Sequence, residues 1–197
     1  MKPPHVNPPP PRGAVHAVRI IGGQWKRTRL PVPDKPGLRP TPDRVRETLF
    51  NWLGQDLTGW RCVDAFAGTG ALGLEAASRG AAEVLMVEQD PQLVLQLRGV
   101  QAKLGATAVK VERANGLSVL GRLAGAGIDL IFLDPPFEAG LFDQALPAAA
   151  AALAADGLIY LEAPAAWDDA RLEPYALAVR RHLRAGAVHA HLLGRAA

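Results

Sequence analysis

The stretch D-A-F-A-G-T-G-A-L-G at positions 64–73 decides the fold of this chain. It follows an apolar, strand-like run and leads into Ala71–Ser78, which we predict to be a helix. Gly68, Gly70 and Gly73 satisfy the pattern G-x-G-x-x-G, which allows a backbone to approach a ligand closely beside a helix N-terminus. The stretch therefore predicts the first strand-to-helix turn of a ligand-binding α/β sheet.

A sheet is predicted from Arg61 onward, where apolar strand-like runs alternate with amphipathic stretches. The five runs are Cys62–Phe66, Val84–Glu88, Val109–Glu112, Asp129–Leu133 and Leu158–Glu162. This alternation predicts a mostly parallel sheet with helices on both faces. Two later runs, Leu177–Leu183 and Val188–Leu193, predict an antiparallel hairpin that completes a seven-stranded, Rossmann-like sheet.

A short β-hairpin is expected near the N-terminus. The strand-like runs Val18–Ile21 and Arg27–Val32 flank Gly22-Gly23, which we predict to be the hairpin turn. Six of the first twelve residues are prolines, a composition typical of a disordered tail. We therefore expect a tail over residues 1–17, a basic extension over 18–57 and a catalytic domain over 58–197.

A helix is predicted after the hairpin. Thr41 is a good N-cap and Pro42 suits the first helical position, so the helix should continue to about Leu53. The helical spacing of its apolar residues predicts that Val45, Leu49 and Trp52 or Leu53 are buried. Arg44 and Arg46 are expected to face away from this buried side.

Composition narrows the class of protein. The 197 residues are 49% hydrophobic and 21% charged, as in an ordinary globular protein. The net charge is only +3, but residues 1–60 hold ten Lys/Arg against four Asp/Glu, an uneven distribution that indicates binding of a polyanion. The single cysteine, Cys62, excludes an intramolecular disulfide and suits a reducing cytoplasm. No apolar run is long enough to span a bilayer.

Two acidic residues bear on the choice of cofactor. Glu88, at the end of the second strand, is placed to accept hydrogen bonds from ribose hydroxyls, which fits both a dinucleotide and S-adenosylmethionine. Asp64 would repel a pyrophosphate but could bind the ammonium group of a methionine moiety, which favours S-adenosylmethionine. Asn115, after the third strand, could contact adenine or cap a helix, and both interpretations stay open.

The tetrapeptide Asp134-Pro135-Pro136-Phe137 follows a very apolar strand at the carboxyl edge of the predicted sheet. An exocyclic base amine is a poor nucleophile because its lone pair is delocalised into the ring. The Asp134 carboxylate and the Pro135 carbonyl could accept its N–H groups and direct that lone pair at a methyl donor, while Phe137 stacks on the extruded base. Taken alone, the tetrapeptide also fits a rigid strand-to-helix turn.

Together these motifs carry a resemblance to a known family. The chain closely resembles the RsmD family, which methylates the N2 amino group of a guanine in 16S ribosomal RNA and has a class I methyltransferase fold. The resemblance spans about Arg19 to Leu193 and is carried by R-I-I-G-G-Q-W-K at 19–26, L-R-P-T-P-D-R-V-R-E-T-L-F-N-W-L at 38–53, the run at 64–81 and D-P-P-F at 134–137.

The resemblance implies roles for three groups of residues. The cofactor S-adenosyl-L-methionine would be held by Asp64, Ala65, Phe66, Gly68, Thr69, Gly70, Gly73, Glu88, Gln89 and Asn115, and the guanine by Asp134, Pro135, Pro136 and Phe137. RNA would be held by Arg19, Lys26, Arg27, Arg29, Arg39, Arg44 and Arg46, although Arg39 and Thr41 could instead contact the cofactor or cap the helix. The substrate would be 16S RNA within the small subunit, and the enzyme a monomer.

Three other functions remain open at this point. A DNA adenine-N6 methyltransferase shares the D-P-P-F turn but usually needs a separate recognition domain, for which the chain is too short. A nonenzymatic RNA-binding assembly factor would keep the fold without turnover, and an NAD-dependent oxidoreductase would share the glycine turn. We expect no metal site, because the paired His189 and His191 suit a partly exposed edge strand.

Overall fold

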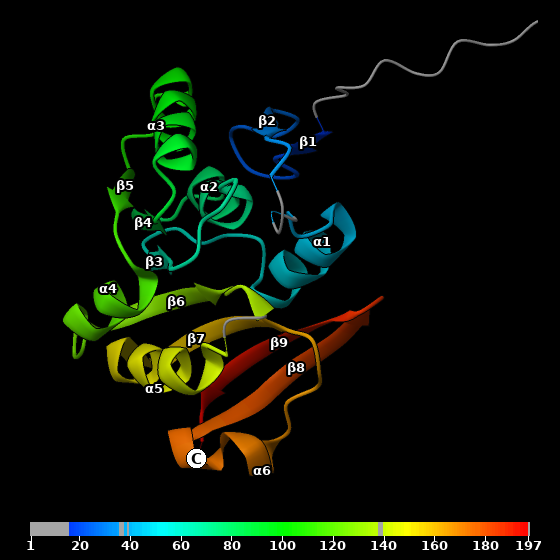
Figure 1. The fold of residues 1–197 in the computed structure, drawn as a ribbon, viewed down its shortest axis with the longest axis vertical. Helices are drawn as coiled ribbons and strands as arrows, with labels where there is room; N and C mark the ends of the chain where they lie inside the picture. The colour runs from blue at the N-terminus through cyan, green and yellow to red at the C-terminus, as the bar shows by residue number, and fades with distance from the viewer. Residues whose placement is uncertain (1–15, 36–37, 39, 138–139, 197) are drawn as a thin grey trace, which may run out of the picture.

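The computed structural model of the protein describes residues 16–35, 38, 40–137 and 140–196 (Figure 1). Its main sheet has seven strands in the order β5-β4-β3-β6-β7-β9-β8. The strands are β3 Arg61–Asp64, β4 Glu83–Glu88, β5 Val109–Arg113, β6 Ile128–Leu133, β7 Leu153–Ala163, β8 Leu177–Ala185 and β9 Val188–Arg195. Neighbouring strands are parallel except where β9 pairs with β7 and β8, so the predicted C-terminal antiparallel hairpin is confirmed.

Helices cover both faces of the sheet, as the alternating pattern predicts (Figure 1). One face carries α1 Asp43–Trp52, α2 Ala71–Ser78 and α3 Pro91–Leu104, and the other carries α4 Gly116–Arg122, α5 Phe142–Ala152, α6 Asp169–Leu172 and a 3-10 turn, Glu173–Tyr175. Successive residues of a strand point to opposite faces of the sheet. Leu130 and Phe132 therefore pack into the core on the α1–α3 side, and Ile131 packs into the core on the α4 and α5 side. No helix in the described residues is long and apolar enough to cross a membrane.

The N-terminal hairpin consists of β1 His16–Arg19 and β2 Arg29–Val32. The two strands pair antiparallel, with Arg19 opposite Arg29. The prediction that Gly22-Gly23 forms the tight turn is wrong, because the connection spans residues 20–28. The backbone at Gly22 instead docks on α2, where its N–H donates to the Glu75 carboxylate at 2.8 Å and its carbonyl accepts from the Ser78 hydroxyl at 2.6 Å. Long-range hydrogen bonds to α2 therefore shape this loop.

The start of α1 also differs from the prediction. Pro42 is the N-cap residue, and no side chain caps the helix. Thr41 is not the cap, because its hydroxyl donates a 2.6 Å hydrogen bond to the Glu162 carboxylate on the distant strand β7. Val45, Leu49 and Leu53 are buried as expected, while Trp52 is partly buried. The N-terminus of α1 is thereby tied to the carboxyl edge of the main sheet.

Candidate active site

A cavity of about 660 Å³ opens at the carboxyl ends of four parallel strands. Four acidic residues line it, one from each strand end: Asp64 (β3), Glu88 (β4), Asp134 (after β6) and Glu162 (β7). The cavity includes the point between β3 and β6 where the strand order reverses, which is where open α/β sheets bind ligands.

The glycine turn forms one wall of the cavity mostly with backbone. Gly70 has a φ of +79° and precedes α2, a left-handed conformation that favours glycine. Gly116 also lines the cavity and opens α4, and a Cβ there would lie only 2.2 Å from the Ala65 carbonyl oxygen. Gly116 therefore lets the start of α4 pack directly against the backbone that follows β3. The sequence interpretation identified Gly70 but missed Gly116, whose requirement comes from a segment 51 positions earlier.

Asp64 and Glu88 are both held by backbone N–H groups of this turn. Asp64 is 2% exposed and accepts a hydrogen bond from Gly73 at 3.0 Å. Burial raises the pKa of Asp64 to about 7, which the Gly73 N–H opposes and the charge of Glu88 increases. Glu88 accepts hydrogen bonds from the N–H of Gly68 at 2.9 Å and of Asp90 at 2.8 Å. The two carboxylates are therefore oriented by the turn itself.

Most of the residues predicted to hold the cofactor border the cavity. Its lining includes Asp64, Ala65, Phe66, Gly68, Thr69, Glu88 and Gln89, whereas Gly70, Gly73 and Asn115 are not part of the lining. The Asn115 side chain caps α4 by accepting the Ser118 N–H at 3.1 Å, and its amide nitrogen donates to the Gln89 side chain at 3.4 Å. One of the two interpretations left open for Asn115, the helix cap, is therefore observed.

The tetrapeptide after β6 lines the cavity along its whole length, from Asp134 to Phe137. Burial raises the pKa of Asp134 well above its ordinary value, and the charges of Glu162 and Asp64 raise it further. The partly exposed Phe137 ring packs near Phe142 of α5, with ring centroids 6.3 Å apart. The segment thus presents a carboxylate and an aromatic ring to the same space as the glycine turn.

Glu162 is a site residue that the sequence analysis did not single out. It is 4% exposed, and its Oε1 accepts hydrogen bonds from the Thr41 hydroxyl at 2.6 Å and the Tyr160 hydroxyl at 2.8 Å. Burial raises the pKa of Glu162, while these two donors lower it. The signal that could have found it is its position: it is an acidic residue near the carboxyl end of a predicted parallel strand.

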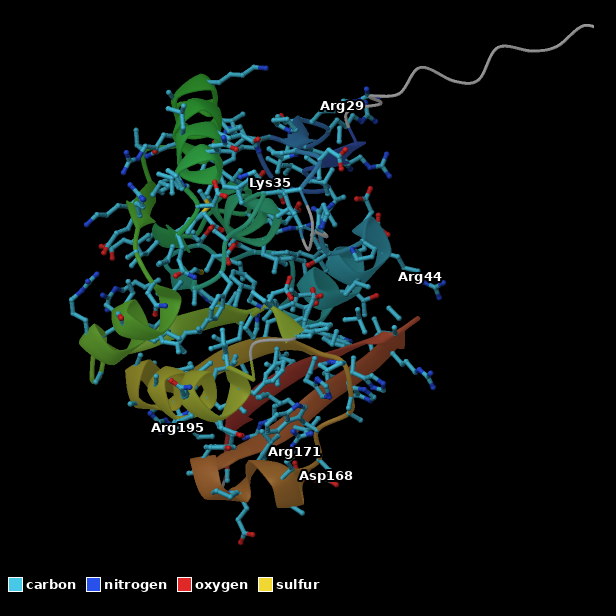
Figure 2. The ribbon with its side chains drawn as sticks, in the orientation of Figure 1. Arg29, Lys35, Arg44, Asp168, Arg171 and Arg195 are labelled. Atoms are coloured by element: carbon cyan, nitrogen blue, oxygen red, sulfur yellow. The ribbon has the colours of Figure 1, made fainter. Side chains whose placement is uncertain are left out.

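The residues predicted to bind RNA differ in their exposure and in their partners. Lys26, Arg27, Arg29 and Arg44 are exposed, and Figure 2 shows Arg29 and Arg44 projecting outward from the hairpin and α1. Arg19 is also exposed but pairs with Asp43 at 2.7 Å. Arg39 lies outside the described residues.

The prediction that Arg46 faces RNA is wrong, because this side chain is buried. Its side chain is 0% exposed and pairs with Asp43 at 2.6 Å and with Glu75 of α2 at 3.3 Å. Burial lowers the pKa of Arg46, and the charges of Glu75 and Asp43 oppose this effect. The physical reason for the error is that helical spacing within α1 gives no sign of a buried partner on another helix.

The rings of His182, His189 and His191 stack on one another across β8 and β9. Among the described residues, no cluster of three or more His, Cys, Asp or Glu side chains could hold a metal ion. His189 and His191 lie on β9, which is an internal strand and not the predicted edge strand. His191 is buried and accepts a hydrogen bond from the Trp167 N–H at 3.0 Å.

Fold and site together define a class I methyltransferase: a seven-stranded sheet with a glycine turn after its first strand and D-P-P-F after its fourth. A family model described as "Conserved hypothetical protein 95" matches residues 18–194. The chain therefore belongs to this family, and the predicted resemblance to the RsmD proteins is confirmed.

Named relatives and solved structures agree with this assignment. The chain is 48% identical over 147 residues to "Ribosomal RNA small subunit methyltransferase D" of Escherichia coli (strain K12), covering 74% of each chain. A protein of the same name from Haemophilus influenzae is 43% identical, covering 66% of this chain and 68% of the relative. A putative methyltransferase structure from Escherichia coli is similar with a TM-score of 0.78 at 41% identity, covering 92% of this chain and 99% of that one.

Proposed function

We propose that this protein transfers a methyl group from S-adenosylmethionine to the exocyclic N2 of a guanine in 16S ribosomal RNA, within the small subunit. The observation that carries the proposal is that Asp134, Pro135 and Phe137 line one cavity with the glycine turn. The name of the Escherichia coli relative supports the substrate class. The remaining steps follow from the chemistry of the lining residues.

The cofactor would occupy the part of the cavity formed by the glycine turn, Glu88 and Gly116. The buried Asp64 carboxylate suits an ammonium group, and Glu88 suits ribose hydroxyls. The absence of a side chain at Gly116 lets the start of α4 pack against the Ala65 carbonyl oxygen in this part of the cavity. When bound, S-adenosylmethionine supplies the electrophilic methyl group.

The guanine amine would be held by the tetrapeptide. Asp134 and the Pro135 carbonyl accept the N2–H groups, which directs the nitrogen lone pair toward the methyl donor. The two prolines limit the freedom of these acceptors, so little reorganisation is needed during transfer. Phe137 stacks on the extruded base. No strong base is required beforehand, since the amine proton becomes acidic once the nitrogen is alkylated.

The experiment that tests this function is transfer of labelled methyl from S-adenosylmethionine to small subunits from a strain that lacks the activity. Nucleoside analysis should place the label in N2-methylguanosine of the 16S RNA. Label in adenine of DNA would replace the proposal with a DNA adenine-N6 methyltransferase. Cofactor binding without transfer to either substrate would replace it with a nonenzymatic factor of the same fold.

Affinity for S-adenosylmethionine should depend on pH through Asp64. Only the ionised carboxylate attracts the cofactor's ammonium group, and the pKa of Asp64 is raised to about 7. Affinity should therefore rise with pH up to about 7, and fall about tenfold per pH unit below it. Calorimetric titration across pH checks this. Asp64→Asn should bind more weakly with a flat profile; a slope retained in that variant would assign the titration to another group.

The exposed basic residues should contribute to RNA affinity and not to cofactor affinity. For Arg44→Glu we expect a several-fold higher KM for small subunits, and a slope of log affinity against log salt that is smaller by about 1. Lys103→Glu, at the exposed C-terminus of α3, makes the same charge change and is the matched control. Equal effects of the two variants would show that overall charge, and not this surface, determines RNA binding.

A further inference from the structure

Glu162 of β7 lies near Asp134, which directly follows β6, but it has no role in the chemistry described above. In the parallel pairing of β6 with β7, Phe132 is opposite Tyr160 and Leu133 is opposite Leu161. Asp134 and Glu162 are therefore at the next position of the same register. Residues two apart on a strand point to the same face, so the Glu162 side chain shares the face of Tyr160, and its charge acts on Asp134 directly after β6.

The Glu162 carboxylate is anchored through one of its oxygens only. Oε1 accepts from both the Thr41 and Tyr160 hydroxyls, at 2.6 and 2.8 Å. Oε2 has no hydrogen-bond partner among the described residues, and Glu162 borders the cavity. Because no buried side-chain oxygen among the described residues lacks a hydrogen-bond partner, the unpaired Oε2 is not sealed in the core and is open to the cavity. The arrangement suits a ligand that brings a hydrogen-bond donor to Oε2.

We propose that Glu162 determines base specificity by accepting the N1–H of the target guanine through Oε2. This inference rests on the proposed function, since it takes guanine N2 as the methylated atom. Guanine presents N1–H and N2–H as adjacent donors on its Watson–Crick edge, which neighbouring carboxylates can accept together. Adenine has an unprotonated N1 with a lone pair that a carboxylate repels. Glu162 would thus reject adenine, whose amine the D-P-P-F turn could otherwise accept.

The two hydroxyl donors also fix which chemical group faces the base. Both donate to Oε1, so the side chain must keep an acceptor there. In Glu162→Gln, the amide oxygen would remain against Thr41 and Tyr160, and the NH₂ group would take the place of Oε2. The cavity would then offer a donor where guanine also has a donor. The same NH₂ group would match a base with an acceptor at N1.

The test uses 2-aminopurine, which keeps the 2-amino group but has an acceptor at N1. Small subunits are reconstituted with 16S RNA that carries guanine or 2-aminopurine at the methylated position, and methyl transfer from S-adenosylmethionine to each is measured. Wild-type enzyme should prefer guanine. In Glu162→Gln the ratio of kcat/KM for guanine over 2-aminopurine should fall by about 10- to 100-fold, the range expected for one base-edge recognition contact.

The ratio within one variant does not depend on how much of the protein is folded, so a partly unfolded variant still gives an answer. 2-Aminopurine also lacks the O6 of guanine. This loss affects wild type and variant alike, so it cancels when their two ratios are compared. Asp134→Asn is the matched carboxylate-to-amide control, and should slow transfer to both bases while leaving their ratio unchanged. Thr41→Val, which removes one anchor of Oε1, should shift the ratio less than Glu162→Gln does.

Two outcomes separate this inference from the proposed function. If wild-type enzyme makes no N2-methylguanosine in small subunits from a strain that lacks the activity, the proposed function itself is wrong. If it does so, and the guanine to 2-aminopurine ratio of Glu162→Gln equals that of wild type, then Glu162 does not read N1 and the inference is overturned.

Discussion

Replacing Asp134 by alanine should lower kcat for methyl transfer by about 10²- to 10³-fold, the usual loss when one preorganised polar group is removed from an active site. Asp134 lines the cavity directly after β6, beside the glycine turn. Without its carboxylate, the N2–H groups keep only the Pro135 carbonyl as an acceptor, and the nitrogen lone pair stays delocalised in the ring. The labelled-methyl assay on small subunits, with nucleoside analysis, measures the effect.

The control separates chemistry from folding and cofactor binding. Asp134→Ala should keep its thermal unfolding transition, and its affinity for S-adenosylmethionine should change by less than the rate does. Asp134→Asn retains one acceptor oxygen and should lose less activity than the alanine variant. Activity of Asp134→Ala close to that of wild type would remove this residue from the catalytic machinery.

Replacing Glu75 by alanine should lower the free energy of unfolding by about 3–5 kcal/mol, because it removes a buried carboxylate from Arg79 and leaves the buried Arg46 paired only with the partly exposed Asp43. The Glu75 side chain is 0% exposed and accepts hydrogen bonds from Arg46 of α1 at 3.3 Å and from Arg79 at 2.9 Å. It also accepts the backbone N–H groups of Ile21 and Gly22, each at 2.8 Å. One carboxylate thus joins the N-terminal loop, α1 and α2.

Urea denaturation measures this loss. The matched control is Glu112→Ala, which removes a carboxylate from an ion pair with Arg122 at 2.8 Å, where the two side chains are 25% and 58% exposed. Such a pair contributes about 0–1 kcal/mol. Similar losses in the two variants would mean that the Glu75 network stabilises the fold no more than a surface pair does.

Local patterns were sufficient to predict the main sheet and one end of the site. The α2 bounds, Ala71–Ser78, agree with the prediction, and six of the predicted strand runs lie within one or two residues of observed strands. β7 is the exception, because it begins five residues before its predicted start at Leu158. Periodicity and turn chemistry are properties of neighbouring residues, so a single sequence can indicate them. The glycine turn and the D-P-P-F tetrapeptide were found for the same reason.

Only the tertiary structure decided the role of residues whose partners are distant in sequence. Thr41 looks like a helix cap, but its hydroxyl donates a hydrogen bond to Glu162, which lies 121 positions away. Arg46 looks like a surface cation, but Glu75 on another helix pairs with it in the core. Gly22 looks like a turn residue, but α2 binds its backbone.

The same physical reason applies to the site. The residue types, and the strand ends on which Asp64, Glu88 and Asp134 lie, could be predicted from the sequence by itself. Which of Glu162's oxygens is anchored, and which one borders the cavity, depends on the register of β6 with β7 and on the packing of α1 against them. Local propensity specifies the elements, whereas the pairing of buried polar groups depends on how those elements pack.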